Sequence, residues 1–284
     1  MRVTCVDGEL RVAGVAFDAE LALYESAQVF HWVRRDGGFA SAVEGRVVLV
    51  KPLRDGFALA GPGAGDAAFW RAYFDLDRDY RTLASACSAY PIAVRALAAL
   101  PGMRVLRQPP WEALVSFILS ANNNVARIRR LTLAVCEELG EPAGVYGLHH
   151  FPAPAILAGA EEARLRALGV GYRAPYLIET ARAVAEGFPL NELRSMPYRE
   201  AHKALLALKG VGPKVADCVL LFGCGHSEAF PVDVWVARLM RQWFGLADVR
   251  NAELADRARV MFGDLAGLIQ QSLFHCARLK LIEL

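Results

Sequence analysis

The chain has 284 residues, of which 55% are hydrophobic and 22% are charged, and its formal net charge is +2. This composition excludes an intrinsically disordered chain, and the length allows a large hydrophobic core and suggests two packed domains. No apolar run reaches the roughly 18 residues that a membrane span requires, and the four acidic residues among the first 20 are untypical of a signal peptide. We therefore expect a globular, cytoplasmic protein with no membrane partner. The small net charge does not diagnose a polyanionic partner.

The six cysteines form no Cys-x-x-Cys pair and show no spacing typical of a zinc site. We therefore expect reduced thiols and no bound metal.

Residues 1–92 contain short β-branched or aromatic runs bounded by glycine and aspartate, at 12–17, 28–34 and 46–51. Asp36-Gly37-Gly38 is a hairpin signal between two of these runs. The pattern predicts an antiparallel β-sheet with one or two helices over residues 1–92.

From about residue 92 onward, apolar residues recur at three- and four-residue steps, which predicts a second, all-helical domain over residues 93–284. Glycines close most of the predicted helices. The fold class is therefore α+β, although the N-terminal segment can also pack on the helical domain. The predicted helices are 111–121, 125–139, 161–168, 174–186, 199–208, 213–222, 234–244 and 265–281.

The most informative segment is 208–218, followed by Pro231-Val232-Asp233. Its two glycines, Gly210 and Gly212, flank Val211 and permit positive φ and close backbone approach, and the adjacent helix N-terminus suits a phosphate. Lys214 follows, and a deprotonated lysine there can attack a sugar carbon. Asp233 is predicted to cap the next helix. Phosphate cradle, nucleophile and carboxylate together indicate chemistry on a nucleic-acid sugar.

The run Gly-Val-Gly-Pro-Lys-Val-Ala-Asp-Cys and the later Pro-Val-Asp resemble the helix-hairpin-helix DNA glycosylases with lyase activity. Among these, the chain looks most like the 8-oxoguanine DNA glycosylases. Blocks at 120–127, 168–174 and 266–274 match the family in the same order, and a weaker echo lies at 28–32. The resemblance implies that the N-terminal sheet is twisted and related to the TATA-binding-protein fold.

The resemblance also implies the reaction. Lys214 would attack C1′ of the damaged nucleotide and form a Schiff base, after which β-elimination nicks the strand. Asp233 would stabilise the positive charge that develops on the sugar. The alternative is that Asp233 only caps its helix and Lys214 only contacts a phosphate.

DNA contacts are implied at the hairpin, Gly210 to Gly212, and at four side chains. Asn122 would enter the space left by the damaged base, and Tyr172 matches the family's wedge. Arg127 and Arg173 match two arginines that grip the unpaired cytosine. The simpler interpretation is a helix–helix corner at Asn122 and two solvated arginines.

A damaged-base pocket is implied at Ala27, Cys218, Pro231, Gln270 and Phe274. Gln270 and Phe274 would read the base edge and stack on its plane, and Cys218 would form a charged dipole with Lys214. A buried thiol and a core phenylalanine remain the alternatives.

The chain departs from the family at two of its positions. Ala27 stands where the family has a glycine whose carbonyl senses the proton on N7 of 8-oxoguanine. Trp235 stands where a histidine near a DNA phosphate is common. The first departure keeps a glycosylase for another lesion as an alternative. The second leaves that phosphate contact without its usual histidine.

We expect a monomeric enzyme of base excision repair that flips 8-oxoguanine out of double-stranded DNA, excises it preferably opposite cytosine, and associates with the nucleoid when bound. The related endonuclease III and adenine glycosylases carry four clustered cysteines that bind an iron–sulfur cluster after the aspartate helix. Here only Cys276 follows Asp233, so no cluster or other cofactor is expected. The alternatives are a glycosylase for another lesion and a non-catalytic DNA-binding hairpin protein.

Overall fold

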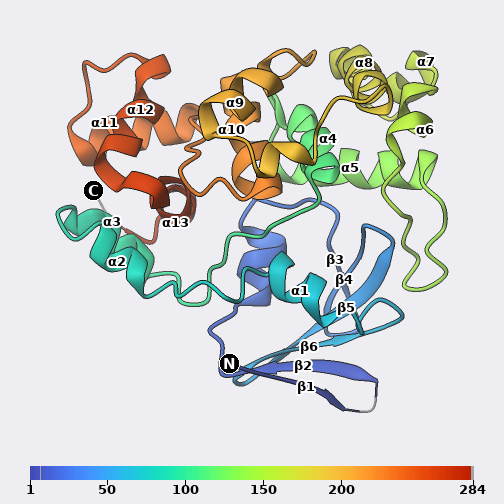
Figure 1. Ribbon diagram of the computed structural model, residues 1–284, viewed down its shortest axis with the longest axis horizontal. Helices are drawn as coiled ribbons and strands as arrows, with labels where there is room; N and C mark the ends of the chain where they lie inside the picture. The colour runs from blue at the N-terminus through green and yellow to red at the C-terminus, as the bar shows by residue number, and fades with distance from the viewer. Residues whose placement is uncertain (7, 283–284) are drawn as a thin grey trace.

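The computed structural model describes residues 1–6 and 8–282 as an antiparallel sheet beneath a body of helices (Figure 1). The sheet has six strands in the order β1-β2-β6-β5-β4-β3, and each neighbouring pair is antiparallel. The strands are β1 (Arg2–Val6), β2 (Glu9–Ala13), β3 (Val33–Arg35), β4 (Gly38–Val43), β5 (Arg46–Leu53) and β6 (Gly56–Ala60).

The sheet is buried on both faces at its centre, which explains why β5 is a continuous apolar run instead of an alternating one. Val48 and Val50 of β5 belong to a cluster with the aromatic side chains of helix α1 (Ala67–Tyr73). Val47 and Leu49 point to the other face and pack with Leu148 from a loop of the helical body. The sheet is therefore held between α1 and the helical body.

The helical body is built around α4 (Pro110–Ser120), in which every residue except Trp111 is buried. The run from Leu114 to Leu119, apolar except for Ser116, explains this, because a helix with apolar residues on all sides must be covered on all sides. The other α-helices are α2 (Thr82–Ala86), α3 (Pro91–Ala98), α5 (Val125–Leu139), α6 (Pro154–Ala158), α7 (Glu162–Ala167), α8 (Ala174–Ala185), α9 (Tyr198–Leu206), α10 (Pro213–Val219), α11 (Val234–Phe244), α12 (Asn251–Phe262) and α13 (Ala266–Leu279).

Short helical turns complete the body. A π-helical turn, η1 (Leu21–Glu25), lies between β2 and β3 in the chain, and a second, η4 (Leu220–Cys224), extends α10. Three 3₁₀ turns are η2 (Gly171–Arg173), η3 (Glu192–Arg194) and η5 (Gly263–Leu265).

The predicted fold class is confirmed, and two predicted helices, 125–139 and 234–244, have the observed bounds. Two of the predicted strands are wrong over most of their length. Of the run 12–17, only the first two residues belong to β2, and of 28–34 only 33–34 belong to β3. The region 28–32 leaves the sheet because Gln28 is buried and bonds through its side chain and backbone to Arg104, Leu106 and Gln108.

Helix α3 spans the predicted domain boundary between residues 92 and 93. It packs on α13, and its Ala93 and Ala96 share a buried cluster with α11 and α12. The segment that follows the sheet domain is thus anchored on the C-terminal helices.

None of the helices within residues 1–6 and 8–282 has the length and apolar character needed to cross a membrane. Over the same residues, no three His, Cys, Asp or Glu side chains are arranged to hold a metal ion. All six cysteines are free, and Cys5 alone is exposed.

Candidate active site

A cavity of about 1250 Å³ opens where segment 24–30, the α4–α5 corner and the N-termini of α10 and α11 meet. Seven of the residues predicted from the sequence line it: Ala27, Asn122, Gly210, Gly212, Lys214, Asp233 and Phe274. A second cavity of about 810 Å³, beside β3 and β4, contains none of the predicted residues.

Lys214 lies in the first turn of α10, and its Nζ donates a hydrogen bond to Ser120 Oγ at 2.9 Å. Ser120 is buried at the end of α4, and its hydroxyl donates in turn to the Phe117 carbonyl at 2.7 Å. The Ser120 proton is therefore committed, so its oxygen can only accept from Lys214. Nζ also lies 5.2 Å from the centre of the Phe117 ring. These contacts fix the position of the amine at the cavity wall.

Asp233 is the N-cap of α11, as predicted. Its Oδ1 accepts hydrogen bonds from the backbone N–H groups of Trp235 at 3.0 Å and Val236 at 2.8 Å. A carboxylate at a helix N-terminus is stabilised by the helix dipole. Oδ2 has no hydrogen bond to any described residue, so one oxygen holds the helix and the other is available for substrate.

Cys218 lies one turn after Lys214 but is buried and does not line the cavity. Burial raises the pKa of the Cys218 thiol to about 12, and the nearby charge of Lys214 only partly opposes this rise. In the free protein the thiol is therefore neutral at physiological pH. This favours the buried-thiol interpretation over a charged dipole with Lys214.

The hairpin before α10 differs in detail from the sequence-based expectation. Only Gly210 has a positive φ, +76°, whereas Gly212 has φ −93° and would accept any residue. A Cβ on Gly210 would lie 2.7 Å from Cβ of Tyr176, while a Cβ on Gly212 would meet no atom within 4 Å. Val211 is buried, so only its backbone can reach a ligand.

The α4–α5 corner carries Asn122, which has a left-handed φ of +50°. Its Nδ2 donates to the hydroxyl of Tyr172 at 3.1 Å, and both side chains are exposed. Asn122, predicted to enter the space left by the base, and Tyr172, the predicted wedge, are thus hydrogen-bonded to each other in the free protein. Tyr172 lies outside the cavity lining, at its margin.

The two predicted cytosine-binding arginines have different environments. Arg173 is only 4% exposed, and its guanidinium donates to the carbonyls of Ala121 and Val170, which braces the corner. Arg127 is exposed, and its side chain makes a single hydrogen bond with the residues that the structure describes, 3.2 Å from Nη2 to the Gly169 carbonyl. Of the two, Arg127 is the one free to contact a ligand.

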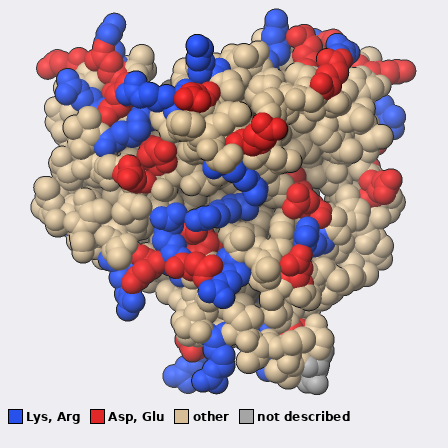
Figure 2. All heavy atoms as spheres, in the orientation of Figure 1, with Lys and Arg blue, Asp and Glu red and all other residues tan. Residues whose placement is uncertain are grey.

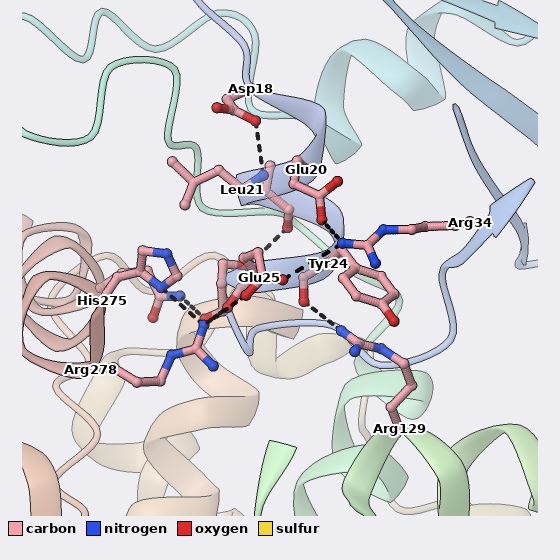
Figure 3. A network of polar contacts seen from close by, with 12 residues as sticks. Asp18, Glu20, Leu21, Tyr24, Glu25, Arg34, Arg129, His275 and Arg278 are labelled. Carbon is pink, nitrogen blue, oxygen red and sulfur yellow. Dashed lines mark hydrogen bonds and ion pairs between the residues drawn. The ribbon is translucent and has the colours of Figure 1, made fainter. Parts of the chain in front are cut away.

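The wall formed by residues 24–28 is held by side chains of the helical body, and Figure 3 shows two of these, Arg129 and Arg278, reaching Tyr24 and Glu25. Within this segment the carbonyl of Ala27 alone accepts no hydrogen bond from the described residues, and Ala27 has a left-handed φ of +58°. The carbonyls of residues 24, 25, 26 and 28 accept, respectively, from Arg129 Nη2, Arg278 Nη2, Gln271 Nε2 at 2.6 Å and Gln108 Nε2 at 2.6 Å.

The same wall is reinforced around Tyr24 (Figure 3). The guanidinium carbons of Arg129 and Arg34 lie 3.6 Å and 4.0 Å from the centre of its ring. Next to Arg278, His275 is fully buried, and burial, with a smaller effect of Arg278, lowers its pKa to about 4. His275 is therefore neutral at physiological pH, which spares Arg278 an adjacent buried positive charge.

Gln270 and Phe274 lie one turn apart on α13, but only Phe274 lines the cavity. Gln270 is 4% exposed, and its Nε2 donates to the buried Pro231 carbonyl at 3.2 Å. Its Oε1 is buried and has no partner among the described residues. Gln270 thus retains an unused acceptor one helical turn from Phe274, which lines the cavity.

Three residues that line the site or hold its wall were not predicted from the sequence: Ser120, Arg129 and Arg278. Ser120 was visible as part of the Ser-Ala-Asn-Asn-Asn motif. Nothing in the pattern distinguished Arg129 or Arg278 from the many other arginines. On the face shown in Figure 2, basic side chains gather across the middle of the molecule, with acidic side chains among them.

A hairpin that presents a lysine, followed by a helix-capping aspartate in the same cavity, defines the helix-hairpin-helix glycosylase architecture. The chain belongs to this family: residues 115–262 match the "HhH-GPD superfamily base excision DNA repair protein" family. Residues 10–114 match the "8-oxoguanine DNA glycosylase, N-terminal domain".

Three similar proteins illustrate the relationship. A probable N-glycosylase/DNA lyase of Methanothermobacter thermautotrophicus is 37% identical over 62% of this chain and 64% of its own length. The N-glycosylase/DNA lyase of Saccharomyces cerevisiae is 39% identical over 53% of this chain and 44% of its own length. The chain therefore matches less than two thirds of either relative. The 8-oxoguanine glycosylase/lyase of Clostridium acetobutylicum, in complex with DNA containing cytosine opposite 8-oxoguanine, has a TM-score of 0.91 and 30% identity, with 99% of each chain covered.

Proposed function

We propose that this protein is a bifunctional DNA glycosylase/lyase that excises 8-oxoguanine from double-stranded DNA during base excision repair. The observation that carries the proposal is the unpaired carbonyl of Ala27, in a cavity that also contains Lys214 and Asp233. In 8-oxoguanine N7 bears a proton, whereas in guanine N7 is an acceptor. A free carbonyl therefore pairs with the oxidised base and repels the normal one.

The remaining pocket residues suit a purine. Phe274 supplies an apolar surface at the cavity for the base plane. Gln270 offers its unpaired Oε1 to a donor on the base edge after a small adjustment of the amide. A base inside the duplex cannot reach these groups, so the nucleotide must be extruded into the cavity.

Lys214 and Asp233 supply the chemistry. The neutral amine of Lys214 attacks C1′ as the bond from C1′ to the base breaks. The base leaves with the electron pair of that bond and takes up the proton that Nζ releases. The unshared oxygen of Asp233 stabilises the positive charge on the sugar. Opening of the sugar ring gives a Schiff base on Nζ. Loss of a C2′ proton then breaks the bond from C3′ to its phosphate oxygen, which nicks the strand.

The hairpin and the corner position the duplex. Gly212 leaves its backbone accessible for a phosphate. The joined Asn122 and Tyr172 form a plug for the gap left by the base. Arg127 contacts the acceptors N3 and O2 of the unpaired cytosine, with Arg173 bracing the corner below, so lesions opposite cytosine are preferred. We further propose that the protein acts as a monomer in the cytoplasm, at the nucleoid.

Single-turnover excision across a panel of duplexes tests the proposal. We expect rapid release of 8-oxoguanine opposite cytosine, slower release opposite adenine, and strand nicking that follows base release. A faster reaction on another lesion would make this a glycosylase of different specificity. Tight binding to all duplexes without base release would make it a non-catalytic DNA-binding protein.

A further inference from the structure

Trp235 is the most exposed tryptophan of the described residues, at 50%, although it lies at the active-site cavity. Trp32 and Trp70 are fully buried in the sheet domain, and Trp111 and Trp243 are partly buried. Its neighbour Val234 is 78% exposed and lines the same cavity. Two neighbouring apolar side chains that are exposed at the cavity indicate a surface that contacts a ligand.

The backbone of Trp235 is fixed by the catalytic site itself. Its N–H donates to Asp233 Oδ1 at 3.0 Å, in the first turn of α11. The indole is therefore carried by a backbone position that is fixed relative to the Asp233 carboxylate. Whatever the indole contacts must be close to the extruded nucleotide.

The chemistry around the indole suits a nucleic acid. The guanidinium carbon of Arg238, one turn later on α11, lies 5.4 Å from the Trp235 ring centre. Arg238 is exposed and has no ion pair or hydrogen bond with the residues that the structure describes. An exposed aromatic ring beside an unpaired arginine provides stacking for a base and a positive charge for its phosphate.

The fold separates Trp235 from the groups proposed to contact the opposite strand. In Figure 1, α10 with Lys214 lies between α11–α12 and α4–α5. The groups proposed to contact the opposite strand, Asn122 and Arg127, belong to the α4–α5 side. Trp235 belongs to the α11–α12 side, where Ala252 and Ala255 of α12 also line the cavity.

We propose that Trp235 is a stacking platform for the nucleobase next to the extruded nucleotide on the damaged strand, with Arg238 contacting the adjoining phosphate. This inference rests on the proposed function for the position of the extruded nucleotide. It assigns the protein a subsite for one flanking base.

The test uses the full chain and a duplex with a non-cleavable tetrahydrofuran abasic analogue opposite cytosine. 2-Aminopurine is placed on the 5′ side or the 3′ side of the analogue, or in the opposite strand. We expect lower 2-aminopurine emission in complexes with the unmutated protein than with Trp235→Ala, at one flanking position of the damaged strand only. Trp235→Phe should restore part of the quenching, and Ile156→Ala, an exposed apolar change on α6, should leave it unchanged.

Affinity provides a second readout. Trp235→Ala should weaken binding about tenfold without changing the salt dependence, because stacking releases no counterions. Arg238→Ala should reduce the slope of log affinity against log salt by about one ion. Equal emission for unmutated protein and Trp235→Ala at both flanking positions would overturn the inference, as would Trp235-dependent quenching confined to the opposite strand.

Borohydride trapping on an 8-oxoguanine duplex separates this inference from the proposed function. Trapping without Trp235-dependent quenching would contradict the stacking role of Trp235 but not the proposed function. Trp235-dependent quenching without trapping would leave the platform and contradict the catalytic proposal.

Discussion

Gly210 and Gly212 are two residues apart, yet the structure predicts opposite consequences for an alanine at each. At Gly212, φ is −93° and a new Cβ would meet no atom within 4 Å. Gly212→Ala should therefore leave the free protein intact, or stabilise it by about 0.4–1 kcal/mol by restricting the unfolded chain. The effect of Gly212→Ala should appear only in the affinity for DNA, because the methyl obstructs the approach of the phosphate and weakens binding by about tenfold or more.

Gly210→Ala should damage the fold instead. Its φ of +76° costs a non-glycine residue about 1–2 kcal/mol. The new Cβ would also lie 2.7–2.8 Å from three atoms of Tyr176, and overpacking of this kind costs about 1–3 kcal/mol. The sum is about 2–5 kcal/mol of unfolding free energy.

Urea unfolding and DNA binding at several salt concentrations, measured on both variants, test this reasoning. The expected result is a large stability loss for Gly210→Ala and a pure affinity loss for Gly212→Ala. If Gly212→Ala binds DNA as tightly as the unmutated protein at every salt concentration, the hairpin does not contact a phosphate. If Gly210→Ala unfolds at the same urea concentration, the strain argument is wrong.

Four further predictions concern single side chains. Ser120→Ala should slow covalent trapping by roughly tenfold at unchanged DNA affinity, because Nζ loses the one acceptor that it has among the described residues. Ser120→Thr should recover much of the rate, and equal rates for all three proteins would exclude this role. Arg127→Ala should reduce the discrimination between cytosine and adenine by about 1–3 kcal/mol, measured as the ratio of excision rates, more than it lowers the best rate. Burial lowers the pKa of His275 to about 4, so the unfolded state binds its proton first as pH falls. Unfolding free energy should therefore fall between pH 6.5 and 4 by at most about 1.4 kcal/mol per unit in urea titrations, and His275→Asn should lack this component. Ala27→Gly should change the free energy of unfolding by less than about 1 kcal/mol, because relief of the left-handed φ offsets the added entropy of the unfolded chain. The same change should raise the rate of 8-oxoguanine excision, and slower excision would show that the methyl does not crowd the base.

Local sequence signals predicted much of the helical body. The bounds of α5 and α11 could be read because Asn124 and Asp233 cap them and Gly140 and Gly245 follow their last residues. Helix α12 was missed because only Leu254, Ala258 and Phe262 of its residues are buried, which leaves a weak apolar face. Segment 28–32 was assigned to a strand because of its β-branched and aromatic residues, but three hydrogen bonds of Gln28 join it to residues 104–108, more than 70 positions away.

The site was predictable where chemistry depends on residue type and spacing, as at Lys214 and Asp233. The site was not predictable where function depends on which hydrogen-bonding group stays unpaired after distant side chains have bonded its neighbours. The unpaired carbonyl of Ala27 is evident only once side chains from three other parts of the chain (Gln108, α5 and α13) are seen to occupy the carbonyls around it. The pairing of Lys214 with Ser120 spans 94 residues and has no sequence signature.

The identity of the nucleophile is the central claim, and peptide mapping of the reduced covalent adduct tests it most directly. The chain has five lysines, and Lys209 is an exposed neighbour that serves as a matched control. After borohydride reduction on an 8-oxoguanine·cytosine duplex, the DNA remnant should be found on Lys214. Lys214→Gln should form no adduct while still binding the duplex, and Lys209→Gln should form it at the unmutated rate. An adduct on Lys209 or on the terminal amine, or undiminished trapping by Lys214→Gln, would contradict the account.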